Sequence, residues 1–118
     1  MSEFSSIKQA VRRFGAERDW QQFHSPKNLS MALAGEAGEL LAVFQWLSEE
    51  ASRALTPQQR QDAIDEIADV QLYLIALADQ LDIDIAQAVT QKMRKNAQKY
   101  PVERFHGSAR KYNAADET

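Results

Sequence analysis

Residues 29–47 read LSMALAGEAGELLAVFQWL, a stretch that would be apolar on nearly every side of a helix. Its only charged residues are Glu36 and Glu39. On a helix these two glutamates share one face, about 60° apart, because each residue turns the helix by about 100°. Leucines such as Leu33 and Leu40 lie on the same face, so we do not expect this face to be exposed to water. The two carboxylates must therefore be protonated, paired with a distant cation or bound to a metal ion.

The composition is typical of one helical, globular domain. The chain has 118 residues, four glycines and three prolines, and it lacks the β-branched clusters that mark strands. With no cysteine, disulfides and thiolate metal sites are excluded. A net charge of −3 does not favour a nucleic-acid polymer as partner. No basic and apolar leader and no apolar run long enough for a membrane span are found, so we expect a cytoplasmic protein.

Four helices are predicted from apolar spacing and capping residues, over about residues 5–20, 26–49, 57–81 and 85–100. Pro101 ends the fourth, and residues 102–118 are predicted to form an extended or flexible tail of the single domain 1–118. Short connections favour an all-α, antiparallel four-helix bundle. The second helix is more apolar than a small monomer can bury, so we expect helix packing between subunits, at least as dimers.

The third predicted helix carries four acids within an arc of about 100°. These acids are Asp62, Asp65, Glu66 and Asp69. Alone, such a stripe is ambiguous, because an acidic face more often simply meets water. An antiparallel pairing with the second helix would bring Glu36 and Glu39 opposite Glu66 and Asp69. Four carboxylates that close cannot all stay ionised without a cation.

Ligands that are all oxygen select a hard divalent ion, Mg²⁺ first and Mn²⁺ second. The Glu-x-x-His pairs of bundle-type di-iron centres are absent from these acidic segments. The alternative to a metal site is a set of protonated or lysine-paired core glutamates.

The fourth predicted helix is basic, and it repeats Lys92, Asn96 and then Lys99 or Tyr100 on one line. Lysine suits phosphate oxygens as a point charge, so a phosphate-bearing ligand fits this line. The rings that could stack on a base are those of Trp20, His24, Trp46 and Tyr73. For each ring the alternative is an ordinary place in the core.

These residues resemble the MazG-like, all-α nucleoside triphosphate pyrophosphatases. The mark of that family is Glu-x-x-Glu, a spacer and Glu-x-x-Asp, which Glu36-Ala-Gly-Glu39 and Glu66-Ile-Ala-Asp69 match. A further acid commonly precedes the first glutamate, and Gly35 stands there instead. This departure favours the dCTP pyrophosphatase branch, whose likeness runs over most of the chain.

The resemblance implies hydrolysis of a nucleoside triphosphate, dCTP or a modified pyrimidine deoxynucleotide, to the monophosphate and pyrophosphate in nucleotide-pool house-cleaning. It implies Mg²⁺, with Mn²⁺ as the alternative, on Glu36, Glu39, Glu66 and Asp69, and the first two of these are the catalytic candidates. It implies a base and sugar pocket from Trp20, His24, Trp46 and Tyr73, and phosphate contacts from Lys92, Asn96 and Tyr100. Relatives form tetramers of tight dimers with sites at subunit interfaces. Two other functions stay open: a non-catalytic nucleotide-sensing bundle and a helical assembly module.

Overall fold

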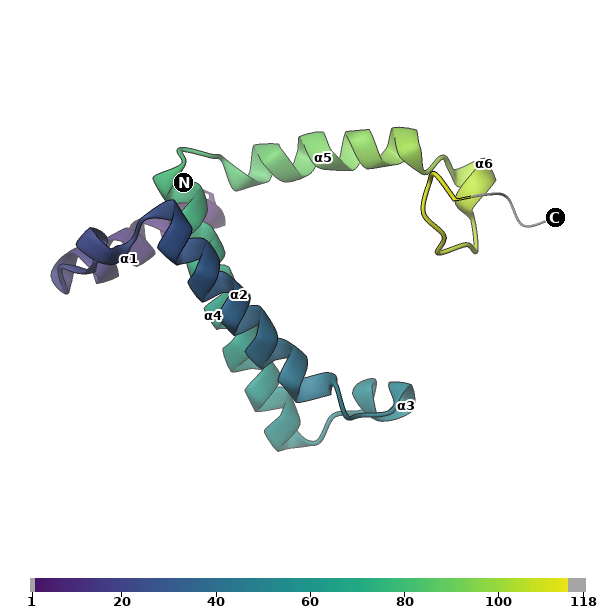
Figure 1. The fold of residues 1–118 in the computed structure, drawn as a ribbon, viewed down its shortest axis with the longest axis horizontal. Coiled ribbons are helices and arrows are strands. Elements are labelled where there is room, and N and C mark those ends of the chain that lie inside the picture. The colour runs from purple at the N-terminus through teal and green to yellow at the C-terminus, as the bar shows by residue number, and fades with distance from the viewer. Residues whose placement is uncertain (1, 115–118) are drawn as a thin grey trace. The chain divides into compact units, whose positions relative to one another are not determined.

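Helices make up the regular structure of residues 2–114, the part of the chain that the computed structural model describes, and no strand occurs there (Figure 1). The predicted all-α class is confirmed for these residues. The elements are α1 (Glu3–Glu17), the 3₁₀ turn η1 (Trp20–Phe23), α2 (Pro26–Phe44), α3 (Glu49–Ser52), α4 (Pro57–Gln80), α5 (Ile85–Lys99) and α6 (Val102–Phe105). The chain divides into two compact units, residues 1–83 and 84–118.

Side-chain caps fix where the long helices begin. The Ser25 hydroxyl accepts a hydrogen bond from the Asn28 N–H at 3.1 Å, and proline follows it at the first helical position of α2. Thr56 and Gln59 form a reciprocal capping box at the start of α4, with bonds of 3.2 and 2.9 Å. Asp84 caps α5. These three starts agree with the sequence.

Three predicted boundaries differ from the structure. The first helix ends at Glu17, because Asp19 has a left-handed φ of 52° that a helix cannot continue through. The second ends at Phe44, and Ser48 instead caps the separate turn α3. Residues 102–105 form α6 where the sequence predicts an extended tail, because the buried Phe105 ring packs edge-to-face on another ring. Residues 115–118 of that tail lie outside the described residues.

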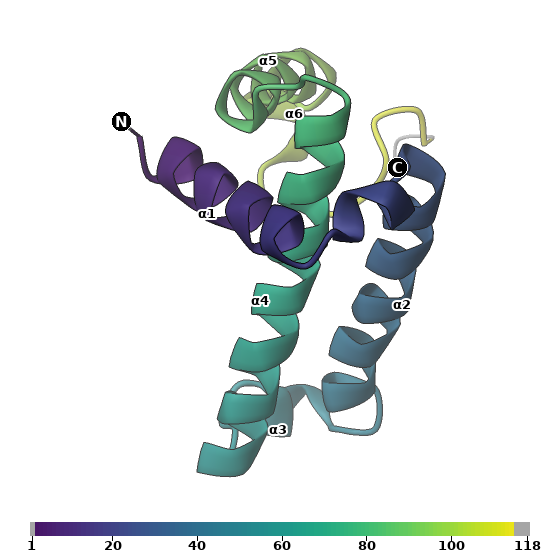
Figure 2. The same ribbon diagram turned by 90° about the vertical axis from the view of Figure 1, so that its left-hand side faces the viewer.

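In the first unit, α2 and α4 run antiparallel side by side, and α1 packs across the second half of α4 (Figures 1 and 2). The core is small. Leu29 of α2 is only 1% exposed, and Ala63, Ile75 and Ala78 of α4 are also buried. No helix within residues 2–114 has the length and apolar character needed to cross a bilayer.

The second unit has its own small cluster of rings. The Tyr100 ring lies 4.8 Å from that of Phe105 and 5.9 Å from that of Tyr112, both edge-to-face. The Lys99 ammonium sits over the Tyr112 ring at 4.9 Å. Ring contacts of this kind hold the end of α5, α6 and the following turns together.

Candidate functional site

Three carboxylates meet where α2 packs against α4. One oxygen from each of Glu36, Glu66 and Asp69 lies within 4.8 Å of the others. Glu36 comes from α2, whereas Glu66 and Asp69 lie one turn apart on α4. All three side chains are half-buried. The antiparallel packing of two long helices therefore places three negative charges in one partly enclosed space.

Glu66 is the electrostatically strained member of this cluster. Its Oε2 atom is buried and has no hydrogen-bond partner. Burial, the neighbouring Glu36 carboxyl group and the charges of Asp69 and Glu39 together raise the pKa of Glu66 above its usual range. The cluster thus favours a shared proton or a bound cation over three bare carboxylates.

Glu39 stands beside the cluster and not within it. Its side chain is exposed, and it is absent from the group whose oxygens lie within 4.8 Å of one another. Its charge nevertheless helps to raise the pKa of Glu66. Of the four carboxylates that the sequence groups together, the structure gathers three and leaves the fourth nearby.

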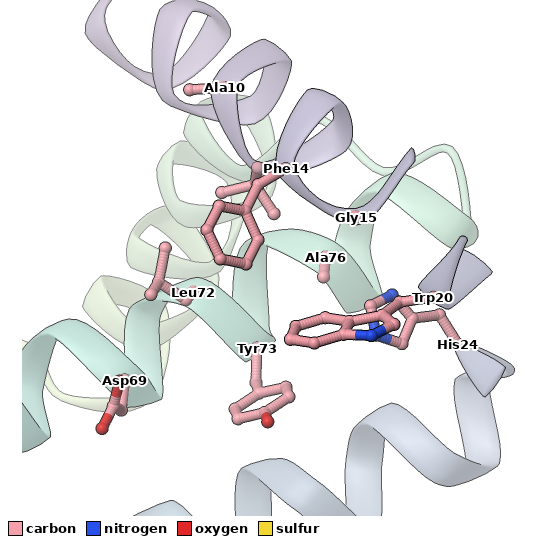
Figure 3. A pocket seen from close by; sticks show the side chains of 10 residues that line it. Ala10, Phe14, Gly15, Trp20, His24, Asp69, Leu72, Tyr73 and Ala76 are labelled. Atoms are coloured by element: carbon pink, nitrogen blue, oxygen red, sulfur yellow. The ribbon is translucent and has the colours of Figure 1, made fainter. Parts of the chain in front are cut away.

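An apolar pocket of about 330 Å³ opens between α1, η1 and α4 (Figure 3). Its lining residues are Ala10, Val11, Phe14, Gly15, Trp20, His24, Asp69, Leu72, Tyr73 and Ala76. Figure 3 shows Asp69 toward one end of the pocket and Trp20 with His24 toward the other. Asp69 therefore belongs to both the acidic cluster and the pocket.

One wall of the pocket is aromatic, and the Arg18 side chain packs against it. The Phe14 and Trp20 rings meet edge-to-face at 5.7 Å. The Arg18 guanidinium lies 3.6 Å from the centre of the Phe14 ring and donates a hydrogen bond to the Phe14 carbonyl at 3.1 Å. Gly15 is buried, and a Cβ there would lie 3.8 Å from the His24 ring. α1 and η1 thus form one wall.

The structure brings Trp20, His24 and Tyr73 to this pocket, as the sequence grouped them. Trp46 is elsewhere: it lies in the turn after α2, is 88% exposed and does not line the pocket. The other three predicted contact residues belong to the second unit, on α5 and at its end. They are Lys92 and Asn96, which are exposed, and Tyr100, which is half-buried among rings.

Several pocket residues are not recognised from the sequence as binding residues. Ala10, Val11 and Phe14 have the apolar spacing of an ordinary helix face, and this spacing predicts packing only. Tyr73 and Ala76 carried a usable signal, because they continue the line of the α4 acids. A pocket of this size with one acidic edge can take a flat ring and place its substituents beside the carboxylates.

Comparison with known proteins gives concordant matches. The model of the MazG-like family matches residues 32–114. Over 108 residues, the chain is 48% identical to dCTP pyrophosphatase 1 of Mus musculus and 43% identical to that of Homo sapiens. Each alignment covers 90% of this chain, but the chain spans only 64% of the length of those relatives. A solved pyrophosphatase from Archaeoglobus fulgidus superposes with a TM-score of 0.80 at 35% identity, covering 86% of this chain and 94% of that one.

Proposed function

This chain belongs to the MazG-like family, and from that premise we propose that it hydrolyses a nucleoside triphosphate to the monophosphate and pyrophosphate. The proposed substrate is dCTP or a modified pyrimidine deoxynucleotide, because the mouse and human relatives are dCTP pyrophosphatases. The observation that carries the proposal is the position of Asp69, which joins the acidic cluster to the aromatic pocket. A nucleotide needs both features side by side.

The acidic cluster fits a hard divalent cation. Three carboxylates converge, and the buried Oε2 of Glu66 has an unused lone pair and no partner. We assign Mg²⁺, with Mn²⁺ as the alternative, to Glu36, Glu66 and Asp69, and we place Glu39 as the fourth acidic contact. When bound, such an ion neutralises charge on phosphate oxygens and lowers the pKa of water.

The other roles follow from the chemistry of each side chain. Trp20, His24 and Tyr73 hold the base in the pocket and exclude water from it. Water attacks the α-phosphorus, a new oxygen–phosphorus bond forms, and the α–β phosphoanhydride breaks to release pyrophosphate. Glu36 accepts the proton of that water. Glu39 is the second catalytic carboxylate and acts as the fourth acidic contact of the metal ion.

The phosphate contacts are assigned to Lys92, Asn96 and Tyr100. These residues recur along α5 and at its C-cap. A lysine ammonium suits phosphate oxygens as a point charge, and an amide or phenol group can donate a hydrogen bond to them.

We also propose that the enzyme is a homo-oligomer, a dimer or a tetramer, in which antiparallel four-helix bundles assemble through helix packing between subunits. Met31 and Leu41 of α2 are 62% and 59% exposed within one chain. Gly35 and Gly38 weaken α2, yet a Cβ at either would meet nothing within 4 Å. A close approach by a second chain accounts for both features. We assign Trp46, which is exposed and does not line the pocket of its own chain, to the pocket of a neighbouring subunit.

The test is a turnover panel of canonical and modified deoxynucleoside triphosphates with Mg²⁺, read by ³¹P NMR. We expect pyrophosphate and the monophosphate as the only products, with dCTP or a modified dCTP turned over fastest. Glu39→Gln should abolish turnover while circular dichroism stays unchanged. Glu50→Gln, an exposed acid on α3, is the matched control and should behave as the unaltered protein does.

Calorimetry with dCTP identifies the two alternatives. Nucleotide binding without release of pyrophosphate would mean a sensing bundle. Neither binding nor release would mean an assembly module whose acids are structural. Either result overturns the proposed enzyme.

A further inference from the structure

A two-bond ion pair joins α1 to α4 behind the pocket. Arg12 Nη2 donates to Asp79 Oδ1 at 2.6 Å, and Arg12 Nε donates to Asp79 Oδ2 at 3.0 Å. The planar guanidinium matches the carboxylate at both oxygens, a geometry that fixes orientation as well as distance. The Asp79 side chain is 20% exposed and that of Arg12 is 54% exposed, so water reaches the pair mainly from the Arg12 side.

The rest of α1 is held shallowly. Gly15 is the one buried residue among the fifteen of this helix. The large side chains Phe4, Ile7 and Phe14 are 43%, 44% and 50% exposed. Apolar contacts of this kind resist separation of α1 from α4 but define its tilt and register weakly. The ion pair supplies the directional contact that they lack.

The pair lies directly behind the pocket. Arg12 is one helical turn before Gly15, and Asp79 is one turn after Ala76; Gly15 and Ala76 both line the pocket. A second space of about 30 Å³ is lined by Arg12, Asp79 and also by His24, which faces the pocket itself. A shift of α1 on α4 therefore moves Gly15 and the Phe14 ring relative to Ala76 and changes the shape of the pocket.

We propose that Arg12 and Asp79 are positioning residues for the nucleotide pocket: their ion pair holds the wall formed by α1 and η1 against α4 in the geometry that binds the base. The role in substrate affinity rests on the proposed function. Neither side chain needs to touch the nucleotide.

Neighbouring charges shape the choice of variants. The Arg12 hydrogen bond is the main cause that lowers the pKa of Asp79, and the charge of Lys8 on the same face of α1 adds to it. Lys8 could take over part of the pairing when Arg12 is lost. Asp79→Asn removes the partner of both cations, so its effect should equal or exceed that of Arg12→Met.

The experiment measures kcat and KM for dCTP in Arg12→Met, Asp79→Asn and the charge-swapped pair Arg12→Asp with Asp79→Arg. Arg13→Met is the matched control, because Arg13 is the next residue on α1 and is exposed. For the two single variants we expect KM to rise about five- to tenfold with kcat within about twofold, the scale of a charge-assisted hydrogen bond. The swapped pair should recover part of that loss, and Arg13→Met should change neither value.

Two results overturn the proposal. An unchanged KM with a lower melting temperature would make the pair purely structural. A lower KM in Asp79→Asn would mean that Asp79 affects binding only through its negative charge and does not position the pocket wall, since the loss of a negative charge by itself favours an anionic substrate.

A ligand-free measurement separates this proposal from the proposed function. In a Trp46→Phe background the emission of Trp20 reports the wall alone, because the chain has two tryptophans. We expect Asp79→Asn to shift that emission to longer wavelength, and an unchanged spectrum overturns the positioning role. If the parent protein releases no pyrophosphate, the proposed function fails, and the spectrum still decides the role of the ion pair.

Discussion

Replacing Leu29 by alanine should remove the deepest apolar anchor between α2 and the rest of the first unit. Leu29 is 1% exposed, so alanine leaves a cavity as well as losing the burial of the removed atoms. Such substitutions in protein cores cost about 3–5 kcal/mol. A unit of about 80 residues has a free energy of unfolding of roughly 4–12 kcal/mol. The variant should therefore lose a quarter or more of the stability of the unit.

Urea unfolding followed by far-ultraviolet circular dichroism measures this loss. Met31→Ala is the matched control, because Met31 lies two residues along α2 and is 62% exposed. In a single chain Met31→Ala should cost less than about 1 kcal/mol. If a second copy covers Met31, its cost should grow with protein concentration, whereas that of Leu29→Ala should hardly change. A cost below about 1 kcal/mol for Leu29→Ala, or equal costs of the two substitutions at the lowest protein concentration, would mean that Leu29 is not the main anchor of α2.

Three further predictions concern single side chains. Asp82 has a left-handed φ of 53° at the end of α4, so Asp82→Gly should raise stability by about 0.5–1 kcal/mol, and a lower melting temperature would contradict it. The pKa of Glu66 is raised in the folded protein, so the metal-free protein should lose stability as the pH rises through the folded pKa of Glu66. Glu66→Gln should therefore have a higher melting temperature than the parent protein at pH 7 without metal. A lower melting temperature would contradict this prediction. Trp20→Ala should weaken dCTP binding by about 1–3 kcal/mol through lost stacking; unchanged affinity in calorimetry would remove Trp20 from the site.

Features of the fold that depend on local chemistry were predictable from the sequence. Ser25, Thr56 and Asp84 each cap the helix that follows them, because a side-chain oxygen near the first backbone N–H groups acts within three residues. The end of α2 was not predictable from apolar spacing. The apolar run continues to Leu47 through a turn, and the spacing of apolar residues does not distinguish this turn from a continuing helix.

The meeting of Glu36 with Glu66 and Asp69 was also predictable, since an antiparallel pairing of the two helices brings their acidic positions opposite one another. The crossing of α1 over α4 was not, because it depends on contacts such as Arg12 with Asp79, which lie 67 residues apart. The spacing of residues along the sequence likewise does not show whether Trp46 contacts the pocket of its own chain or that of another subunit.

A titration with Mn²⁺ followed by electron paramagnetic resonance, for the parent protein and two variants, shows whether the acidic cluster binds a metal ion. Glu66→Gln removes a carboxylate from the acidic cluster. Asp62→Asn removes one a turn earlier on α4, where the Asp62 carboxylate accepts a hydrogen bond from Gln58 at 2.8 Å. We predict tight binding by the parent protein and Asp62→Asn, and binding at least about tenfold weaker by Glu66→Gln. Equal binding by all three proteins, or none by the parent protein, would contradict the assignment of Glu36, Glu66 and Asp69 as the metal site.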